Sequence, residues 1–474
     1  MQKIIIRNFG AVEYAEIEIN KVLVLIGEQA SGKSTIAKLI YFFKSLKNDL
    51  RNQLRQDTGR SYFDPALDLK FPIREKFYDF FGSTYHLPDF EITFYYNVEN
   101  DRYIKLTLNP DRKVEAYLSF IDQNFKDSAA AIKKLFRRQR SINVDRFYEQ
   151  IAYNRDESSL SQRLSSLLNS AFSSNQTDSL FIVASRNVTV GYSNTFEKYL
   201  FLDTQNNLEN NLENKKPFQR KEQTIDETLM LNFIERTAQI KKFFAKYMGF
   251  EGLIESFEED QIKKEKLYQV KTKIEQILKG EYRIDDQGEK IVFTQARTEV
   301  SKYVYLHNSS SGQQEVIRIL QDIFINILER SKIFRVLEEP EAHLFPVAQK
   351  QLIELLSLMV NQDEDNQIII TTHSPYVLTV FNNLLFAKRV ANKNPSTEAE
   401  VSEIIPQEFW LNANDFSAYS LGNHFMGEET QYCESIFNVE KGTIRQNYLD
   451  TVSEMLGGAF NSLYSIHAKS FGIR

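Results

Sequence analysis

The stretch Gly27-Glu28-Gln29-Ala30-Ser31-Gly32-Lys33-Ser34 decides the fold of this 474-residue chain. It follows the apolar run at 22–26, and it precedes apolar residues that recur at helical spacing, namely Ile36, Leu39, Ile40 and Phe43. A strand, a glycine-rich loop and an amphipathic helix, in this order, form the context in which the pattern G-x-x-x-x-G-K-[ST] makes a phosphate-binding loop. We therefore expect an α/β domain to begin here.

The residue types of this loop suit the phosphates of a nucleotide. Glycines let backbone N–H groups close around phosphate oxygens, and the N-terminus of the following helix favours negative charge. Lys33 is expected to reach the β- and γ-phosphates, and Ser34 is expected to be a ligand of Mg²⁺. The predicted ATP-binding residues are Gly27, Glu28, Gln29, Ala30, Ser31, Gly32, Lys33, Ser34 and Thr35.

A second apolar strand, at 333–337, ends in the two acids Glu338 and Glu339. Ligands of α/β proteins collect at the carboxyl ends of strands, so these carboxylates are expected near the phosphate-binding loop. We expect Glu338 to hold Mg²⁺ through water and Glu339 to act as the general base on the attacking water. Taken alone, the segment fits a strand that merely ends in a charged turn, and it is the neighbouring motifs that favour nucleotide chemistry.

Three further segments complete the pattern. A serine-rich loop at 309–315 precedes another helical apolar pattern, and the segment 341–346 follows the second acid. The apolar run at 368–370 leads into Thr371-Thr372-His373-Ser374-Pro375. In this order they resemble the signature loop, D-loop and H-loop of ABC-type ATPases. The resemblance implies that His373 contacts the γ-phosphate as a catalytic residue. It also implies that a second copy's γ-phosphate is bound in trans by the signature residues Ser310, Ser311, Gly312 and Gln313, where Ser311 replaces the usual glycine.

The resemblance covers roughly residues 1–45 and 300–390. Within the family, the sequence is especially similar to a prokaryotic branch. That branch includes overcoming-lysogenization-defect proteins and ATPase subunits of anti-phage systems such as PARIS and Septu. It implies an ATPase that uses ATP and Mg²⁺, a homodimer or a multiple of dimers, and a sensor or scaffold role that controls a separate effector nuclease. A more distant similarity to SMC and RecF-type heads leaves a DNA-repair or recombination ATPase that clamps DNA as the alternative. The two intact acids count against a protein that binds ATP without hydrolysing it.

The predicted fold class is α/β, an ABC-type ATPase head with an antiparallel β subdomain and a helical insertion. The subdomain is expected from strand-like segments at 90–96 and 103–108, and a β-hairpin is expected at 282–293. A polar segment at 204–220 is expected to be a mobile loop. The expected domains are the N-terminal part of the head with its β subdomain at 1–200, the helical insertion at 201–280, the C-terminal part of the head at 281–400 and a C-terminal extension at 401–474.

Composition limits the compartment and the partners. Hydrophobic residues at 42%, charged residues at 26% and 10 prolines describe a folded protein. We expect it to be cytoplasmic and free of membrane, because the chain shows neither a leader nor an apolar run near the ~20 residues that span a bilayer. The net charge of -6 argues against a surface coated with nucleic acid. A local DNA contact stays open beside a plain solvated helix face for the basic cluster Lys133, Lys134, Arg137, Arg138 and Arg140.

Several relatives are excluded by what the chain lacks. A single cysteine, Cys433, rules out a zinc hook and a disulfide framework, and the 6 histidines show no zinc-ligand or HNH spacing. The part after the H-loop strand is too short for a TOPRIM nuclease domain of ordinary size. No Q-loop is assigned. Arg186 is a candidate phosphate sensor or else a surface arginine, and Arg7 and Phe9 are candidate adenine contacts.

Overall fold

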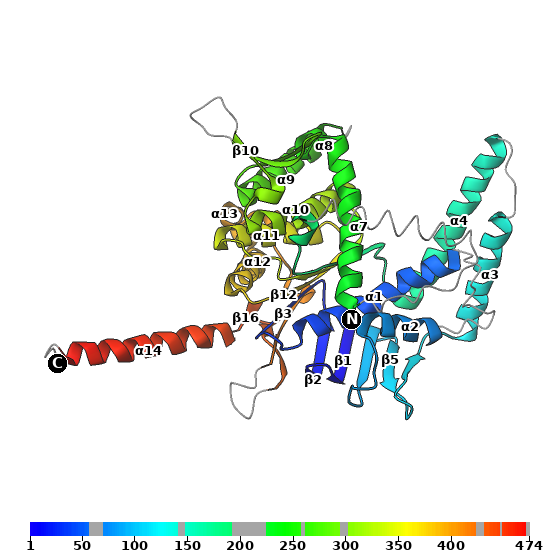
Figure 1. Cartoon of the computed structure of the whole chain (residues 1–474), viewed down its shortest axis with the longest axis horizontal. Helices are drawn as coiled ribbons and strands as arrows, with labels where there is room; N and C mark the ends of the chain where they lie inside the picture. The colour runs from blue at the N-terminus through cyan, green and yellow to red at the C-terminus, as the bar shows by residue number, and fades with distance from the viewer. Residues whose placement is uncertain are drawn as a thin grey trace.

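The computed structural model describes residues 1–55, 70–140, 147–191, 224–256, 261–293, 302–422, 431–445 and 448–470. The polar segment predicted at 204–220 lies outside these residues. Two large sheets, two small sheets and several helices make up the described chain (Figure 1).

The larger sheet has the strand order β14-β13-β3-β12-β11-β7. Its strands are β3 (Val22–Gly27), β7 (Asp178–Ile182), β11 (Ile333–Glu338), β12 (Gln367–Thr372), β13 (Phe416–Leu421) and β14 (Cys433–Ser435). Every pairing is parallel except the one between β13 and β14. The four central strands are buried along their whole length, as expected for a parallel sheet that is covered on both faces.

The register brings the carboxyl ends of the central strands to one edge of the sheet. Gly27 pairs with Leu421, and Glu338 pairs with Thr371. The phosphate-binding loop, the two acids and the segment that leads to the histidine all leave the sheet at this edge. The placement follows from parallel pairing, since parallel strands point the same way.

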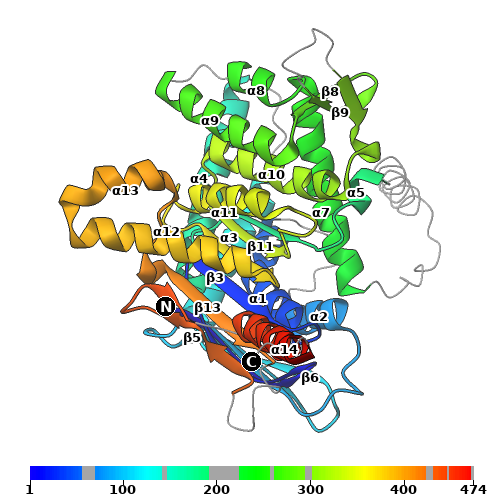
Figure 2. The ribbon, with the colours of Figure 1, turned by 90° about the vertical axis from the view of Figure 1, so that its left-hand side faces the viewer.

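Helix α1 (Lys33–Arg55) lies between the larger sheet and a second, antiparallel sheet. On one side, the ring of Tyr41 stacks on Phe334 of β11 at 6.3 Å. On the other side, Phe43 stacks on Phe94 at 5.1 Å, and its carbonyl accepts a hydrogen bond from Tyr96. Across the larger sheet from α1 lie α10 (Ser311–Glu329), α11 (Pro346–Val360) and α12 (Pro375–Lys393) (Figure 2).

The antiparallel sheet has the order β2-β1-β4-β5-β6. Its strands are β1 (Gln2–Phe9), β2 (Val12–Ile19), β4 (Glu91–Asn97), β5 (Arg102–Leu108) and β6 (Val114–Leu118). Buried and exposed positions alternate along β2, as they do where one face of a sheet meets the core. The predicted antiparallel subdomain is therefore confirmed, and the first two strands of the chain belong to it.

Helices and a smaller sheet fill the remaining described regions. The predicted hairpin is present as β8 (Glu281–Asp285) and β9 (Gly288–Phe293), and β10 (Lys302–Tyr305) adds a third strand that leads into η1 (Leu306–Asn308). Helix α5 (Val188–Gly191) follows β7. The other helices are α2 (Lys70–Phe81), α3 (Gln123–Arg140), α4 (Phe147–Phe172), α7 (Ile225–Lys246), α8 (Phe250–Ser256) and α9 (Gln261–Leu278).

The boundary predicted at residue 400 does not coincide with an edge of the larger sheet. Strands β13 and β14 come from the segment predicted as a C-terminal extension, yet β13 pairs with β3 along its whole length. The rest of that segment holds short elements and one long helix. They are η2 (Pro395–Thr397), α13 (Glu398–Ile404), η3 (Gln407–Phe409), η4 (Ala413–Asp415), β15 (Phe437–Asn438), β16 (Thr443–Ile444) and α14 (Tyr448–Ser470).

None of the helices in the described part of the chain is both long enough and apolar enough to cross a membrane.

Candidate nucleotide site

The phosphate-binding loop connects β3 to α1 in a conformation that needs its two glycines. Gly27 has φ 155°, and a Cβ there would lie 2.4 Å from the Leu421 carbonyl oxygen. Gly32 has φ 82°, and a Cβ there would lie 2.7 Å from a methyl carbon of Val12. Both contacts are closer than real Cβ atoms make, and both backbone angles suit glycine. The pattern recognised in the sequence is thus a steric requirement of this fold.

Lys33 begins α1 and turns back over the loop. Its Nζ donates hydrogen bonds to the carbonyl oxygens of Gly27 at 2.9 Å and Glu28 at 2.6 Å. Burial lowers the pKa of Lys33 from its ordinary 10.5 to about 8, although the nearby carboxylates of Glu339 and Glu28 oppose this shift. The ammonium is therefore held inside the loop, with a negative carboxylate close to it.

Glu338 ends β11 beside the first turn of α1. The Ser34 hydroxyl donates a hydrogen bond to its carboxylate, and burial raises the pKa of Glu338. Its Oε1 atom is buried and has no hydrogen-bond partner among the described residues. A hydroxyl and a carboxylate with a spare oxygen form the hard oxygen donor set that Mg²⁺ prefers. These two residues therefore fit a Mg²⁺ site.

Glu339 follows directly and points to the neighbouring strand. Its backbone takes the left-handed conformation, with φ 42°, and its N–H donates to the Thr371 carbonyl at 2.9 Å. Its carboxylate oxygen lies 3.2 Å from Nε2 of His373, and both side chains are partly exposed. The hydrogen bond from His373 lowers the pKa of Glu339, and the charges of Lys33 and Arg186 lower it further, against the opposing effect of burial. Glu339 is therefore held as a carboxylate next to the loop lysine.

Arg186 lies under the two acids. It is fully buried, and its guanidinium donates to the carbonyl oxygens of Glu338 at 2.6 Å and Glu339 at 3.0 Å. It also donates to the Val183 carbonyl at 2.9 Å and forms an ion pair with Glu315 of α10 at 3.4 Å. The sequence analysis expected either a phosphate sensor or a surface arginine. The residue is not on the surface, and its described hydrogen bonds go to protein groups.

The predicted D-loop is joined to the H-loop strand through Glu341. The hydroxyl of Thr372 and the backbone N–H of His373 both donate to its Oε1 atom, the latter at 3.3 Å. Burial raises the pKa of Glu341. The D-loop also touches the signature loop, because the Gly312 backbone packs on the His343 carbonyl. A Cβ on Gly312 would lie only 2.6 Å from that carbonyl oxygen. The D-loop therefore contacts both the histidine segment and the signature loop of the same chain.

The signature loop forms the N-terminus of α10. Ser310 caps the helix, since its hydroxyl accepts from the Gln313 N–H at 3.4 Å and the Gln313 side chain accepts in return from the Ser310 N–H. Ser310 and Ser311 are exposed, whereas Gly312 is buried. Among the described residues, no hydrogen bond joins this loop to the phosphate-binding loop of the same chain. Its capped helix end faces solvent and is open to a ligand from outside the chain.

Two positions that the sequence analysis missed enclose the phosphate-binding loop. The Tyr432 hydroxyl lies 2.8 Å from the Ser31 carbonyl and 2.6 Å from the Ala11 carbonyl. Gly422 comes within contact of the Ser31 side chain, where a Cβ would be 2.7 Å from Cβ of Ser31. Gly422 directly follows β13, and Tyr432 directly precedes β14. No local sequence pattern indicates where these two strands lie in the sheet. Only the strand pairing brings them to the loop.

Of the two candidate adenine contacts, Arg7 and Phe9, the structure makes only Arg7 accessible. Phe9 is buried, and its ring packs edge-on against Phe77, Phe81 and Phe90 at 5.1–5.8 Å. A ring inside this aromatic cluster is not available to stack on a base, so this candidate is wrong. Arg7 is exposed, and its guanidinium lies over the ring of Tyr14 at 5.3 Å.

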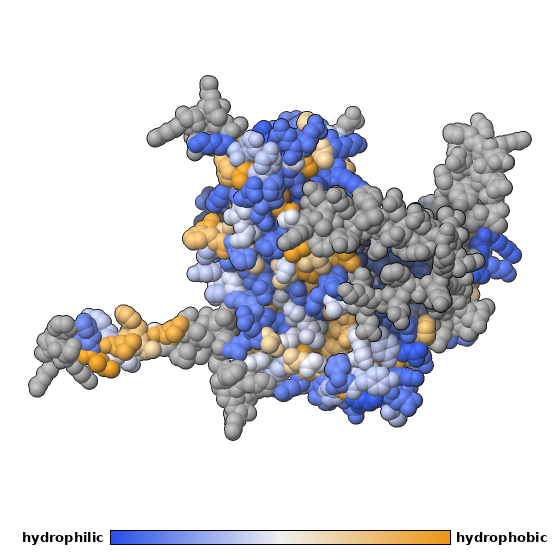
Figure 3. All heavy atoms as spheres, in the orientation of Figure 1, coloured by the Kyte–Doolittle hydropathy of each residue, from blue (hydrophilic) through white to orange (hydrophobic). Residues whose placement is uncertain are grey.

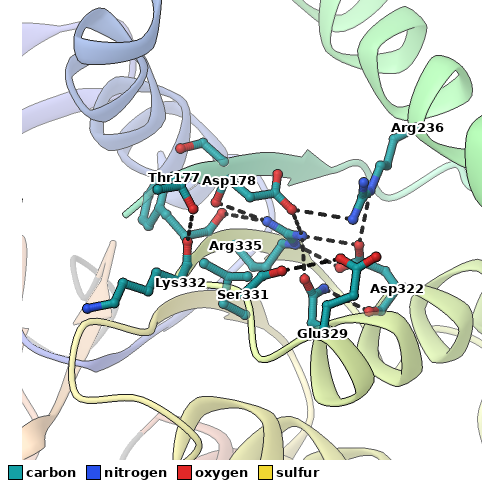
Figure 4. Close-up of polar contacts among 12 residues, drawn as sticks. Thr177, Asp178, Arg236, Asp322, Glu329, Ser331, Lys332 and Arg335 are labelled. Carbon is teal, nitrogen blue, oxygen red and sulfur yellow. Dashed lines mark hydrogen bonds and ion pairs between the residues drawn. The ribbon is translucent and has the colours of Figure 1, made fainter. Parts of the chain in front are cut away.

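A second buried arginine fixes α10 to the acidic strand. Arg335 of β11 is fully buried and donates to Asp322 at 2.7 Å and to Asp178 at 2.7 Å (Figure 4). Arg236 of α7 pairs with the same two carboxylates, at 3.3 Å with Asp178 and 3.5 Å with Asp322. The carboxylates hold the pKa of Arg335 well above its usual range despite burial. The network ties the signature helix, the strand that ends at Glu338, and α7 into one unit.

A search of curated proteins found no match. Similar solved structures include the Smc head domain with an extended coiled coil bound to the C-terminal domain of ScpA, from Pyrococcus furiosus. It has a TM-score of 0.34 and 14% identity, over 97% of this chain and 100% of that chain.

Two further similar structures have lower coverage. The SMC head domain from Thermotoga maritima has a TM-score of 0.30 and 12% identity, over 80% of this chain and 90% of that chain. The SmcHead bound to the C-winged helix domain of ScpA has a TM-score of 0.33 and 13% identity, with the same coverage. The family model described as an AAA ATPase domain matches residues 1–378. The chain therefore belongs to the AAA ATPase domain family.

Proposed function

We propose that this protein binds ATP with Mg²⁺ and hydrolyses it at a site that a second copy completes. The observation that carries the proposal is the Glu339–His373 contact of 3.2 Å at the sheet edge from which the phosphate-binding loop also leaves. The positive charge of Lys33 contributes to the lowered pKa of Glu339, so the lysine and this carboxylate share one site. A phosphate-binding lysine beside a carboxylate and a histidine is the arrangement that phosphate hydrolysis needs.

Binding is assigned to the loop and to the first turn of α1. The backbone N–H groups of 27–35 and the N-terminus of α1 favour an anion, and Lys33 supplies a positive charge. Its described hydrogen bonds to the Gly27 and Glu28 carbonyls must be exchanged for phosphate oxygens when a nucleotide enters. Ser34 and Glu338 would hold Mg²⁺, which when bound neutralises charge on the phosphate oxygens.

Hydrolysis is assigned to Glu339, with His373 as its partner. Because its pKa is lowered, Glu339 is a carboxylate at neutral pH and can accept a hydrogen bond, and then a proton, from a water molecule. His373 orients that carboxylate through the 3.2 Å contact and would itself reach the γ-phosphate. The Arg186 hydrogen bonds to the carbonyls of both acids keep the strand end in place.

The position of the signature loop supports completion of the site by a second copy. Ser310 and Ser311 are exposed at the capped N-terminus of α10, so they are open to a phosphate bound by another chain. Self-complementary use of one surface by two copies gives a symmetric dimer with two equivalent sites. In this arrangement bound ATP joins the two chains, and hydrolysis releases them.

Two substitutions test the chemistry. Lys33→Ala should abolish tight ATP binding, whereas Glu339→Gln should keep binding, lower kcat by about 10²–10⁴-fold and trap an ATP-bound dimer. Glu364→Gln is the matched control, because it removes the same charge from an exposed loop residue. Fluorescent-nucleotide binding, phosphate release and light scattering give the three readouts. Normal hydrolysis by Glu339→Gln would disprove the assignment of the base.

For the cellular role, we propose the sensor or scaffold ATPase of a bacterial anti-phage system that controls a separate effector nuclease. The support is the resemblance carried by the segments at 338–346 and 371–375. The test is purification of tagged Glu339→Gln protein with ATP from cells that carry the neighbouring genes. A stoichiometric nuclease-like protein in the complex is the expected result, and a bare dimer that carries DNA would contradict it.

A DNA-clamping repair ATPase is the second candidate, because α3 presents basic side chains. Lys134, Arg137 and Arg138 are exposed on this helix. A DNA clamp would show an affinity that falls steeply with salt, with a slope that decreases when these residues are neutralised. Binding that is weak and insensitive to their replacement by glutamine would remove this candidate.

A further inference from the structure

Helix α14 leaves the body of the protein and exposes large apolar side chains. Figure 1 shows it directed away from the two large sheets, and Figure 3 shows apolar residues along its surface. Five of its side chains are exposed by 61–66%, which are Leu456, Phe460, Leu463, Tyr464 and Ile466. Single exposed apolar residues are ordinary, but a contiguous group on one helix marks an interaction site.

The apolar residues share one face of the helix. Leu456, Phe460 and Leu463 follow the spacing i, i+4, i+7, which is the a/d seam of helices that associate side by side. The rings of Phe460 and Tyr464, one turn apart, contact each other at 6.4 Å. The seam is therefore a continuous apolar strip.

The opposite face of the helix is small and polar. It carries Asn461, Ser462 and Ser465. The hydroxyl of Ser462 donates to the Gly458 carbonyl, and that of Ser465 donates to the Asn461 carbonyl, both at 2.9 Å. Because these hydroxyls are satisfied within the helix, the polar face needs no hydrogen-bond partner from another molecule, and the apolar face is the one left to be covered.

Charge narrows the choice of partner. The stretch 456–467 contains no Lys, Arg, Asp or Glu. A helix that lies on a membrane surface normally carries Lys and Arg on its polar face, whereas the polar face of 456–467 carries Asn and Ser. An acidic or basic partner would likewise find no complementary charge on these residues. An uncharged apolar seam is best covered by an equally uncharged apolar seam, and the same helix of another copy provides one.

We propose that α14 is a self-association element, whose apolar seam packs on α14 of a second copy. With 61–66% exposure, the five side chains leave on the order of 600 Å² accessible on each helix. Two helices together provide on the order of 1,200 Å², which reaches the lower range of specific interfaces. The apolar strip spans residues 456–466 of this 23-residue helix, which is about one and a half heptads.

This contact is separate from the ATP-dependent dimer proposed above. It uses α14 rather than the strand edge that carries the nucleotide site, so it requires neither ATP nor Mg²⁺. If both contacts operate, each chain has two self-association surfaces, and assemblies larger than a dimer become possible. Only this last step rests on the proposed function.

The test is the mass of the full-length chain without nucleotide. Light scattering at micromolar concentration, on the Lys33→Ala background to exclude ATP-dependent pairing, should give at least twice the mass of one chain. Phe460→Asp with Leu463→Asp, or a stop after residue 447, should halve that mass or lower it further. The matched control is Asn461→Asp with Ser465→Asp, which adds the same charge to the opposite face and should keep the larger mass.

Three outcomes would overturn the proposal. They are a nucleotide-free chain that is already monomeric, a seam variant that keeps the larger mass, and a control that dissociates as fully as the seam variant. A monomer that binds phosphatidylserine vesicles through α14 would assign the seam to a membrane instead. Loss of ATPase activity in Lys33→Ala has no bearing on these masses, so the two proposals fail independently.

Discussion

Replacement of Arg186 by methionine should separate two roles of this buried side chain. The guanidinium pairs with the buried carboxylate of Glu315, and it also donates to the carbonyls of both Glu338 and Glu339. Removing one partner of a buried ion pair leaves the other charge uncompensated, at a cost of about 3–5 kcal/mol. We therefore expect Arg186→Met to lower the free energy of unfolding by about that amount, measured from urea unfolding curves.

The double variant Arg186→Met with Glu315→Met distinguishes stability from activity. Replacing a buried ion pair by apolar side chains of similar volume is often neutral for stability, so most of the lost free energy should return. The hydrogen bonds to the two acidic residues stay absent, however. Since a misplacement of about 1 Å at a reacting group can cost roughly 10²-fold in rate, kcat for ATP hydrolysis should stay about 10–100-fold below that of the wild type.

Arg318→Met is the matched control for this experiment. Its guanidinium is equally buried and pairs at two points with Glu289, at 2.6 and 2.8 Å. It should lose a similar free energy of unfolding and keep kcat near the wild-type value at temperatures where the chain is folded. Wild-type kcat in the Arg186→Met and Glu315→Met double variant would refute the reasoning, because Arg186 would then serve only to neutralise Glu315.

Three other predictions concern the phosphate-binding loop. The pKa of Lys33 is about 8, so its ammonium is present below that pH and is lost above it. The KM for ATP should therefore rise from pH 8 to 9.5, by up to about ten-fold per pH unit. A flat profile would contradict a binding role for this charge. Gly32→Ala should abolish ATP binding in a nucleotide titration, because its Cβ would lie 2.7 Å from Val12, whereas Gly82→Ala, with nothing within 4 Å, should bind normally. Tyr432→Phe removes the hydroxyl that contacts the Ser31 and Ala11 carbonyls, and it should raise the KM for ATP about 5–10-fold with kcat unchanged. A change in kcat alone would exclude this positioning role.

The sequence predicted the fold class and the segments that meet at the candidate site because their information is local. A glycine-rich loop between a strand and a helix has a fixed spacing, and the acids at 338 and 339 end an apolar strand. Parallel pairing then places such ends at one edge, as the register of Glu338 with Thr371 shows. The roles of these residues stay a prediction, although the structure brings them together.

Features that depend on long-range pairing could not be predicted in this way. The segment 416–421 looks like any short strand, and nothing in it indicates that it pairs with β3. Tyr432 reaches the loop only because β14 pairs with β13, which in turn pairs with β3. Phe9 was a plausible base-stacking ring until the structure placed it among Phe77, Phe81 and Phe90. Tertiary packing decides whether one particular side chain is buried, and the periodicity of the sequence does not predict that packing.

The two buried arginines constrain how the site can move. Arg186 links Glu315, near the start of α10, to the backbone carbonyls of Glu338 and Glu339. Arg335, in the middle of β11, pairs with Asp322 of the same helix. A shift of α10 along β11 would separate at least one buried charge from its partner, at a cost of several kcal/mol. The signature loop and the acidic pair of one chain should therefore move as a rigid unit. Any rearrangement that accompanies nucleotide binding must then fall on other contacts, such as those between Lys33 and the carbonyls of its own loop.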